Sequence, residues 1–69
     1  MKIGTKVRMS KELKGLLKSN GSVDHVREFG HMIGVVIPKE PDIEHWPEVE
    51  VKWGDTELHY LYHPDQLEE

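Results

Sequence analysis

Hydrophobic and polar residues alternate near the start of the chain. Val7 and Met9 alternate with Lys6 and Arg8, which is the period of two expected of a strand with one buried face. The alternation predicts a first strand over Thr5–Met9.

The segment His31–Ile37 is apolar and rich in β-branched residues, which favours a strand at the centre of a sheet. Gly34 interrupts this segment, and a glycine inside a strand indicates a bulge or a tight bend. The acidic segment 38–48 follows, and its prolines predict a projecting loop, because proline supplies no ladder donor. They are Pro38, Pro41 and Pro47.

Two further strand-like segments, 49–53 and 56–62, flank Gly54-Asp55 and predict a hairpin with a two-residue turn. In this register Trp53 pairs with Thr56, apolar residues share one face and opposite charges meet on the other. A loop two residues longer would preserve the same faces. The side chains expected to point inward are Val49, Val51, Trp53, Leu58 and Tyr60.

Residues 10–18 have the pattern of a short amphipathic helix. Ser10 is a favourable N-cap, and Asn20-Gly21 can end the helix. Its apolar face contains Leu13, Leu16 and Leu17, while Lys11, Lys14 and Lys18 face solvent. Residues 22–30 are compatible with either another helical turn or an extended loop. A short last strand is expected over 66–68, with Leu67 inward.

Length and composition limit the architecture. The chain has 69 residues, so we expect a single domain over residues 1–69. It contains no cysteine, which excludes disulfide bonds and favours a cytoplasmic protein. No stretch is apolar and long enough to predict a membrane span.

The order of these elements resembles that of the SH3-like small β-barrels, especially Tudor-like, KOW-like and Mib/Herc2-type domains. The similarity covers Gly4–Met9 and His31–Glu68 and includes the G-V-V strand, the V-x-V-K-W hairpin and the Pro-Asp-x-Leu-Glu tail. It implies a mainly β fold, a five-stranded SH3-like barrel with a short helix and long loop inserted after the first strand, at about 10–30. Such barrels bind peptides, nucleic acid or a neighbouring subunit, and seldom catalyse reactions alone.

Aromatic residues are the first candidates for partner contacts. Trp46 lies in the acidic loop beside His45, where it is either an exposed anchor or a cover for the open end of the barrel. A cage for a methylated cation would draw on several rings. The candidate contacts are Trp46, His45, Phe29 and Tyr62, with Tyr60 as a further ring for a cage.

Five histidines are present, and His59 and His63 fall on one face of a strand. A metal site would need a third ligand, and no spacing supplies one. We therefore expect no metal and no cofactor. The chain also has no nucleophile motif and no phosphate-binding glycine loop, which predicts that it is not an enzyme.

Charge is unevenly distributed. Residues 1–31 contain seven Lys and Arg against three acidic residues, whereas residues 32–69 contain two lysines against ten acidic residues. Nucleic-acid binding through the basic half is therefore an alternative function, opposed by the net charge of −4. The residues that would carry it are Lys6, Arg8, Lys11, Lys14 and Lys18.

These observations predict a small non-catalytic binding module or accessory subunit that mediates a protein–protein interaction. The expected contacts are the 38–48 loop, the 10–30 insertion and exposed sheet edges. Because a small barrel seldom closes completely, edge-strand addition and a homodimer are both compatible with the pattern, as is a monomer.

Overall fold

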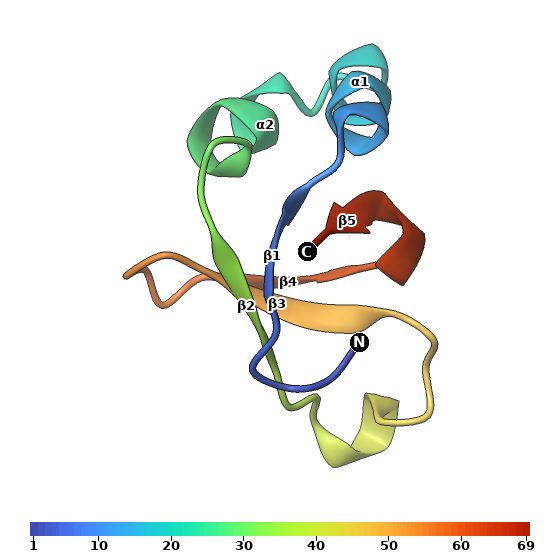
Figure 1. Cartoon of the computed structure of the whole chain (residues 1–69). Coiled ribbons are helices and arrows are strands. Elements are labelled where there is room, and N and C mark those ends of the chain that lie inside the picture. Colours follow the sequence, from blue (N-terminus) through green and yellow to red (C-terminus); the bar gives the residue numbers. More distant parts are fainter.

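Five antiparallel strands form one sheet that curls into a half-barrel in the computed structural model, which describes residues 1–69 (Figure 1). The strand order is β4-β3-β2-β1-β5. The fold is therefore mainly β, as predicted. The strands are β1 (Lys6–Met9), β2 (Gly34–Ile37), β3 (Val49–Trp53), β4 (His59–Tyr62) and β5 (Leu67–Glu68).

Two helices, α1 (Lys11–Ser19) and α2 (Val23–Phe29), lie between β1 and β2 and pack together at one end of the sheet, at the top of Figure 1. The hydroxyl of Ser10 accepts a hydrogen bond of 3.0 Å from the Leu13 N–H and so caps α1. The second helix settles the choice left open for residues 22–30. Two 3₁₀ turns, η1 (Pro41–Ile43) and η2 (Pro64–Gln66), follow β2 and β4.

Strands β1 and β2 follow the predicted alternation. Val7 and Met9 are buried, while Lys6 and Arg8 are exposed. β2 is the central strand of the sheet, as expected, but it begins only at Gly34. The preceding residues continue from α2 as a turn instead.

Gly34 lies in a regular ladder and not in a bulge, because it pairs with Val7 on one side and Trp53 on the other. A Cβ atom at this position would approach Val51 Cγ1 to 2.4 Å and Trp53 Cε3 to 2.8 Å. The absence of a side chain therefore gives the buried indole ring room to lie against the central strand.

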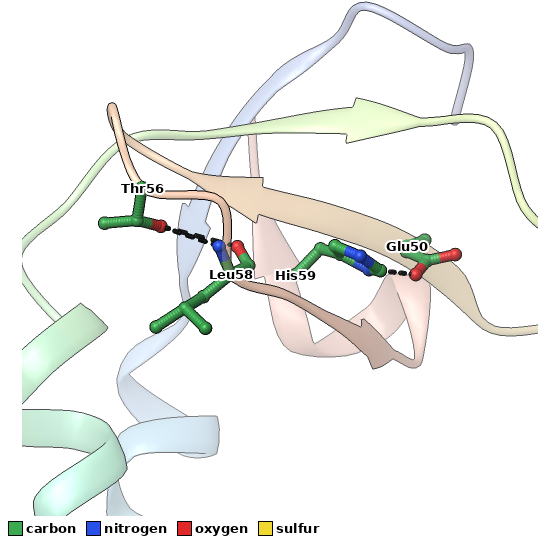
Figure 2. A network of polar contacts seen from close by, with 4 residues as sticks. All are labelled: Glu50, Thr56, Leu58 and His59. Atoms are coloured by element: carbon green, nitrogen blue, oxygen red, sulfur yellow. Dashed lines mark hydrogen bonds and ion pairs between the residues drawn. The ribbon is translucent and has the colours of Figure 1, made fainter.

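The hairpin register is the longer-loop alternative, and the predicted pairing of Trp53 with Thr56 is wrong. Val51 pairs with Tyr60 and Val49 with Tyr62. The Thr56 hydroxyl explains the longer turn: it donates to the Trp53 carbonyl (2.7 Å) and accepts from the Leu58 N–H (3.2 Å), the latter drawn in Figure 2.

Burial on β4 also differs from the prediction. Leu58 and Tyr60 were expected in the core, but they are 44% and 38% exposed, because β4 is an edge strand with no neighbour beyond it. Tyr62 is buried in their place. The apolar side of the hairpin is therefore covered only toward the end of β4.

The buried core is one cluster beneath the helices. It contains Val7, Met9, Leu13, Phe29, Val36, Val51, Trp53, Tyr62 and Leu67. Leu67 points inward as predicted, whereas Leu16 of α1 remains 55% exposed. Neither helix has the length and apolar content needed to cross a membrane.

The contact between Gly34 and Trp53 predicts opposite effects of alanine at two glycines. Gly34→Ala should lower the free energy of unfolding by about 1–3 kcal/mol, because the added Cβ overlaps buried atoms. Gly15→Ala in α1 should raise it by about 0.5–1 kcal/mol, because nothing lies within 4 Å and alanine favours the helix. Urea denaturation measures both, and a neutral Gly34→Ala would contradict the packing described here.

Candidate functional site

The free edge of β4 is the feature of this fold most suited to binding. The Trp53 N–H donates to the Leu58 carbonyl (3.3 Å), so Leu58, Tyr60 and Tyr62 direct their backbone groups toward β3. By the same alternation, the N–H and C=O groups of His59 and Leu61 point away from β3. No strand follows there, so a second extended chain can reach these donors and acceptors.

The free edge is bounded at both ends. After β4, the His63 N–H donates to Gln66 Oε1 (3.0 Å) and the Gln66 N–H donates to the His63 carbonyl (2.9 Å). Before β4, the chain bends at Thr56 and Glu57. Beyond η2, β5 pairs with β1 and not with β4, so the half-barrel stays open between β4 and β5.

A groove of about 420 Å³ runs beside this edge, between β4 and the two helices. Its walls are mainly apolar. The lining residues are Leu13, Leu16, Leu17, Asn20, Ser22, His25, Tyr60, Leu61, Tyr62 and Gln66. We call this space, together with the free backbone of His59 and Leu61, the β4 edge groove.

A hydrogen-bonded chain of aromatic residues fixes the wall of the β4 edge groove. Trp53 Nε1 donates to the Tyr62 hydroxyl (2.9 Å), which lies 2.6 Å from His25 Nε2. Burial raises the pKa of Tyr62 to about 12. Tyr62 therefore keeps its proton, and its hydroxyl is hydrogen-bonded to the imidazole of His25. The His25 ring also packs edge-on against Tyr60, with ring centroids 4.8 Å apart.

The opposite face of β4 has a different polar contact. Glu50 is buried on β3, where the register places it between Ile37 and Leu61, and His59 Nδ1 is its hydrogen-bond partner (Figure 2). A buried carboxylate needs such a partner. The His59 side chain is thus hydrogen-bonded to Glu50 of β3, while its backbone N–H and C=O remain free at the edge.

The structure separates the predicted aromatic contacts. Trp46 and His45 are exposed on the loop after η1, and the ammonium group of Lys39 holds this loop by donating to the carbonyls of Trp46 and Glu48. Phe29 and Tyr62, by contrast, are core residues.

The burial of Phe29 and Tyr62 leaves little of either side chain for a partner to contact, and of the two only Tyr62 lines the β4 edge groove. They are 1% and 6% exposed, because α2 places Phe29 on Trp53 and the register turns Tyr62 inward. No ring pair includes Trp46. The aromatic rings therefore pack on one another and do not form a cage around an open space.

A second groove, of about 540 Å³, lies at the other end of the sheet. Its lining mixes apolar residues of the N-terminus and β2 with Glu44, Glu48 and Glu50. Neither His45 nor Trp46 lines it. It offers no free backbone edge comparable to that of β4.

The basic residues fall on two surfaces. Lys11, Lys14 and Lys18 share the face of α1 that points away from the buried Leu13, since they are spaced three and four positions apart. Lys6 and Arg8 lie on the outer face of β1. None of the five is within ion-pair distance of a carboxylate.

The histidines do not converge. His59 contacts Glu50, whereas His63 lies 3.5 Å from Asp65 in the next turn. No group of three or more His, Cys, Asp or Glu side chains is arranged to hold a metal ion. The site is therefore described by backbone groups and apolar side chains.

Sequence reasoning missed Leu16, His25 and Leu61 as lining residues. One signal for the edge was present in the sequence. Residues 58–62 contain no Lys, Glu, Asp or Pro, the residues with which exposed edge strands are commonly protected.

Comparisons with protein-family models, with curated proteins and with solved structures return no match to this chain.

The environment of His25 predicts a pH-dependent stability. Burial lowers the pKa of His25 below its ordinary value of 6.5, and nearby Glu28 offsets part of this effect. The unfolded chain then binds more protons than the folded chain, so the free energy of unfolding should fall as the pH drops below about 6.5. Urea denaturation between about pH 5 and 7 measures the slope.

His25→Gln should reduce this loss, while His45→Gln on the exposed loop should keep the slope of the wild type. An unchanged slope in His25→Gln would show that other groups dominate the titration.

The exposed position of Trp46 predicts that it contributes little to folding. Trp46→Ala should change the free energy of unfolding by less than about 1 kcal/mol, because the side chain is 44% exposed and pairs with no other ring. Thermal or urea unfolding followed by circular dichroism checks this. A loss of several kcal/mol would show that the indole covers the sheet.

Proposed function

We propose that this chain is a small protein-interaction module whose binding element is the β4 edge groove. An extended segment of a partner adds to the sheet next to β4. The observation that carries the proposal is the free N–H and C=O pairs of His59 and Leu61, which lie directly beside an apolar groove. A second extended backbone supplies donors and acceptors at the same spacing, so it satisfies both residues together.

The side chains around the edge define what such a segment contains. In an added strand, alternate side chains point to opposite faces of the sheet. One set enters the groove beside Leu16, Leu17 and Tyr60, where apolar side chains gain the most from burial. The other set lies on the outer face beside His59 and Leu61. A partner segment with apolar residues at every second position fits this arrangement.

We further propose that the half-barrel is an SH3-like small barrel with a helical insertion after its first strand. The continuous path from β1 to β4, with β5 returning to pair with β1, supports this assignment. A non-catalytic role is supported by the groove itself. Its only imidazole, His25, is held between Tyr62 and the rings of Phe29 and Tyr60.

The proposal is tested by selecting peptides from a random display library on the immobilised domain and measuring their affinity by calorimetry. Leu61→Pro should weaken binding by about tenfold or more, because it removes an outward N–H and places a ring at the edge. Ile33→Lys should leave the affinity unchanged, because Ile33 is 52% exposed in the turn that precedes β2. Circular dichroism checks that both variants remain folded.

Amide hydrogen exchange supplies a second readout, since bound peptides should protect the amides of His59 and Leu61. Peptides that bind Leu61→Pro as tightly as wild type would contradict the proposal, as would protection confined to the loop containing Trp46.

Nucleic-acid binding is the second candidate, favoured by the unpaired lysines Lys11, Lys14 and Lys18 on the outer face of α1. If it is correct, affinity for a mixed-sequence oligonucleotide should fall steeply with added salt, because binding releases counterions. Replacing the three lysines by glutamate should abolish this binding and leave peptide binding at β4 unchanged. Affinity that is insensitive to both changes would exclude this candidate.

A further inference from the structure

We infer that the extended segment that pairs with β4 is β4 of a second copy of this chain. The inference rests on the proposed function, because it uses the same free backbone groups. It names their partner and predicts a symmetric dimer.

The free groups of β4 are complementary to themselves. If two copies run antiparallel with His59 of each opposite Leu61 of the other, every outward N–H meets an outward C=O. A two-fold axis then passes beside Tyr60, and the same patch serves both copies. This is the isologous arrangement of symmetric homodimers.

A register shifted by two residues in either direction would pair backbone groups that are already hydrogen-bonded or that lie outside the extended strand. A shift in one direction pairs His59 with His63 of the second copy, but the backbone of His63 is already bonded to Gln66. A shift in the other direction pairs Leu61 with Glu57 of the second copy, where the chain bends out of the strand. The register centred on Tyr60 is thus the one in which both free residues are used within β4.

The side chains agree with this register. On the inner face, Tyr60 lies opposite Tyr60 of the second copy, and Leu58 lies opposite Tyr62, so exposed apolar surface beside the groove becomes covered. The segment 58–62 contains no Lys, Arg, Asp or Glu that would oppose its own like charge across the axis.

A second copy therefore supplies hydrogen bonds and apolar cover in one register, with no like charges opposed within residues 58–62.

Single cysteines test the register directly, because the chain contains no cysteine of its own. In the symmetric register, only residue 60 faces itself across the axis, as a non-hydrogen-bonded pair with Cβ atoms close enough for a disulfide. Under a mild glutathione redox buffer, Tyr60→Cys should give at least about tenfold more disulfide-linked dimer than His59→Cys or Leu61→Cys. Non-reducing electrophoresis and mass spectrometry measure the fraction.

Sedimentation equilibrium of the wild type, up to millimolar concentration, should show a monomer–dimer equilibrium. Leu61→Pro should abolish it, and Ile33→Lys should retain it. A dimer that persists in Leu61→Pro, or that cross-links best at residue 59 or 61, overturns the inference.

A wild type that stays monomeric at all concentrations also overturns it. In that case selected peptides that protect His59 and Leu61 would still support the proposed function, so the two failures are distinguishable. If neither self-association nor peptide protection is found, both the dimer inference and the proposed function are wrong.

Discussion

The indole ring of Trp53 lies against the bare backbone of Gly34, and the other elements are arranged around this contact. No side chain fits between the two residues. Phe29 stacks on the indole from α2, which ties the helical insertion to the sheet. Tyr62 packs against it edge-on and accepts its N–H, which fixes the far end of β4. The curl of the sheet and the cover over one of its ends thus depend on one buried aromatic residue.

The contact between Tyr62 and the indole of Trp53 also bears on why β4 has a free edge. Tyr62 packs in the core. The chain then turns directly into η2, which allows Leu67 to pair with β1. This path brings β5 to the opposite side of the sheet and leaves β4 without a second neighbour. Because the helices cover the end of β4 near Tyr62 but not Leu58, apolar surface and free backbone occur together. The candidate site is therefore a consequence of how the small sheet fails to close.

Local patterns in the sequence were sufficient to predict the strands, the buried face of β1 and the capping role of Ser10, because each depends on residues close in the chain. The predicted hairpin loop was two residues too short. Both registers put the same residues on each face, so the alternation could not distinguish them, and the hydrogen bonds of the Thr56 hydroxyl accompany the longer turn. The roles of Phe29 and Tyr62 were not predictable, since they depend on where α2 packs. The free edge of β4 likewise follows from strand order, which residue patterns do not determine.

The other edge of the sheet differs from β4 in a way that limits how far an assembly can grow. β5 has only two residues, and the acidic Glu68 and Glu69 lie at its end. Short, charged edges are poor templates for further strands. A pair of chains joined through β4 would present only β5 at its two outer edges. Pairing would therefore use the one edge of each copy that readily accepts another strand. Such an association is finite: it closes at two chains and does not propagate into a fibre.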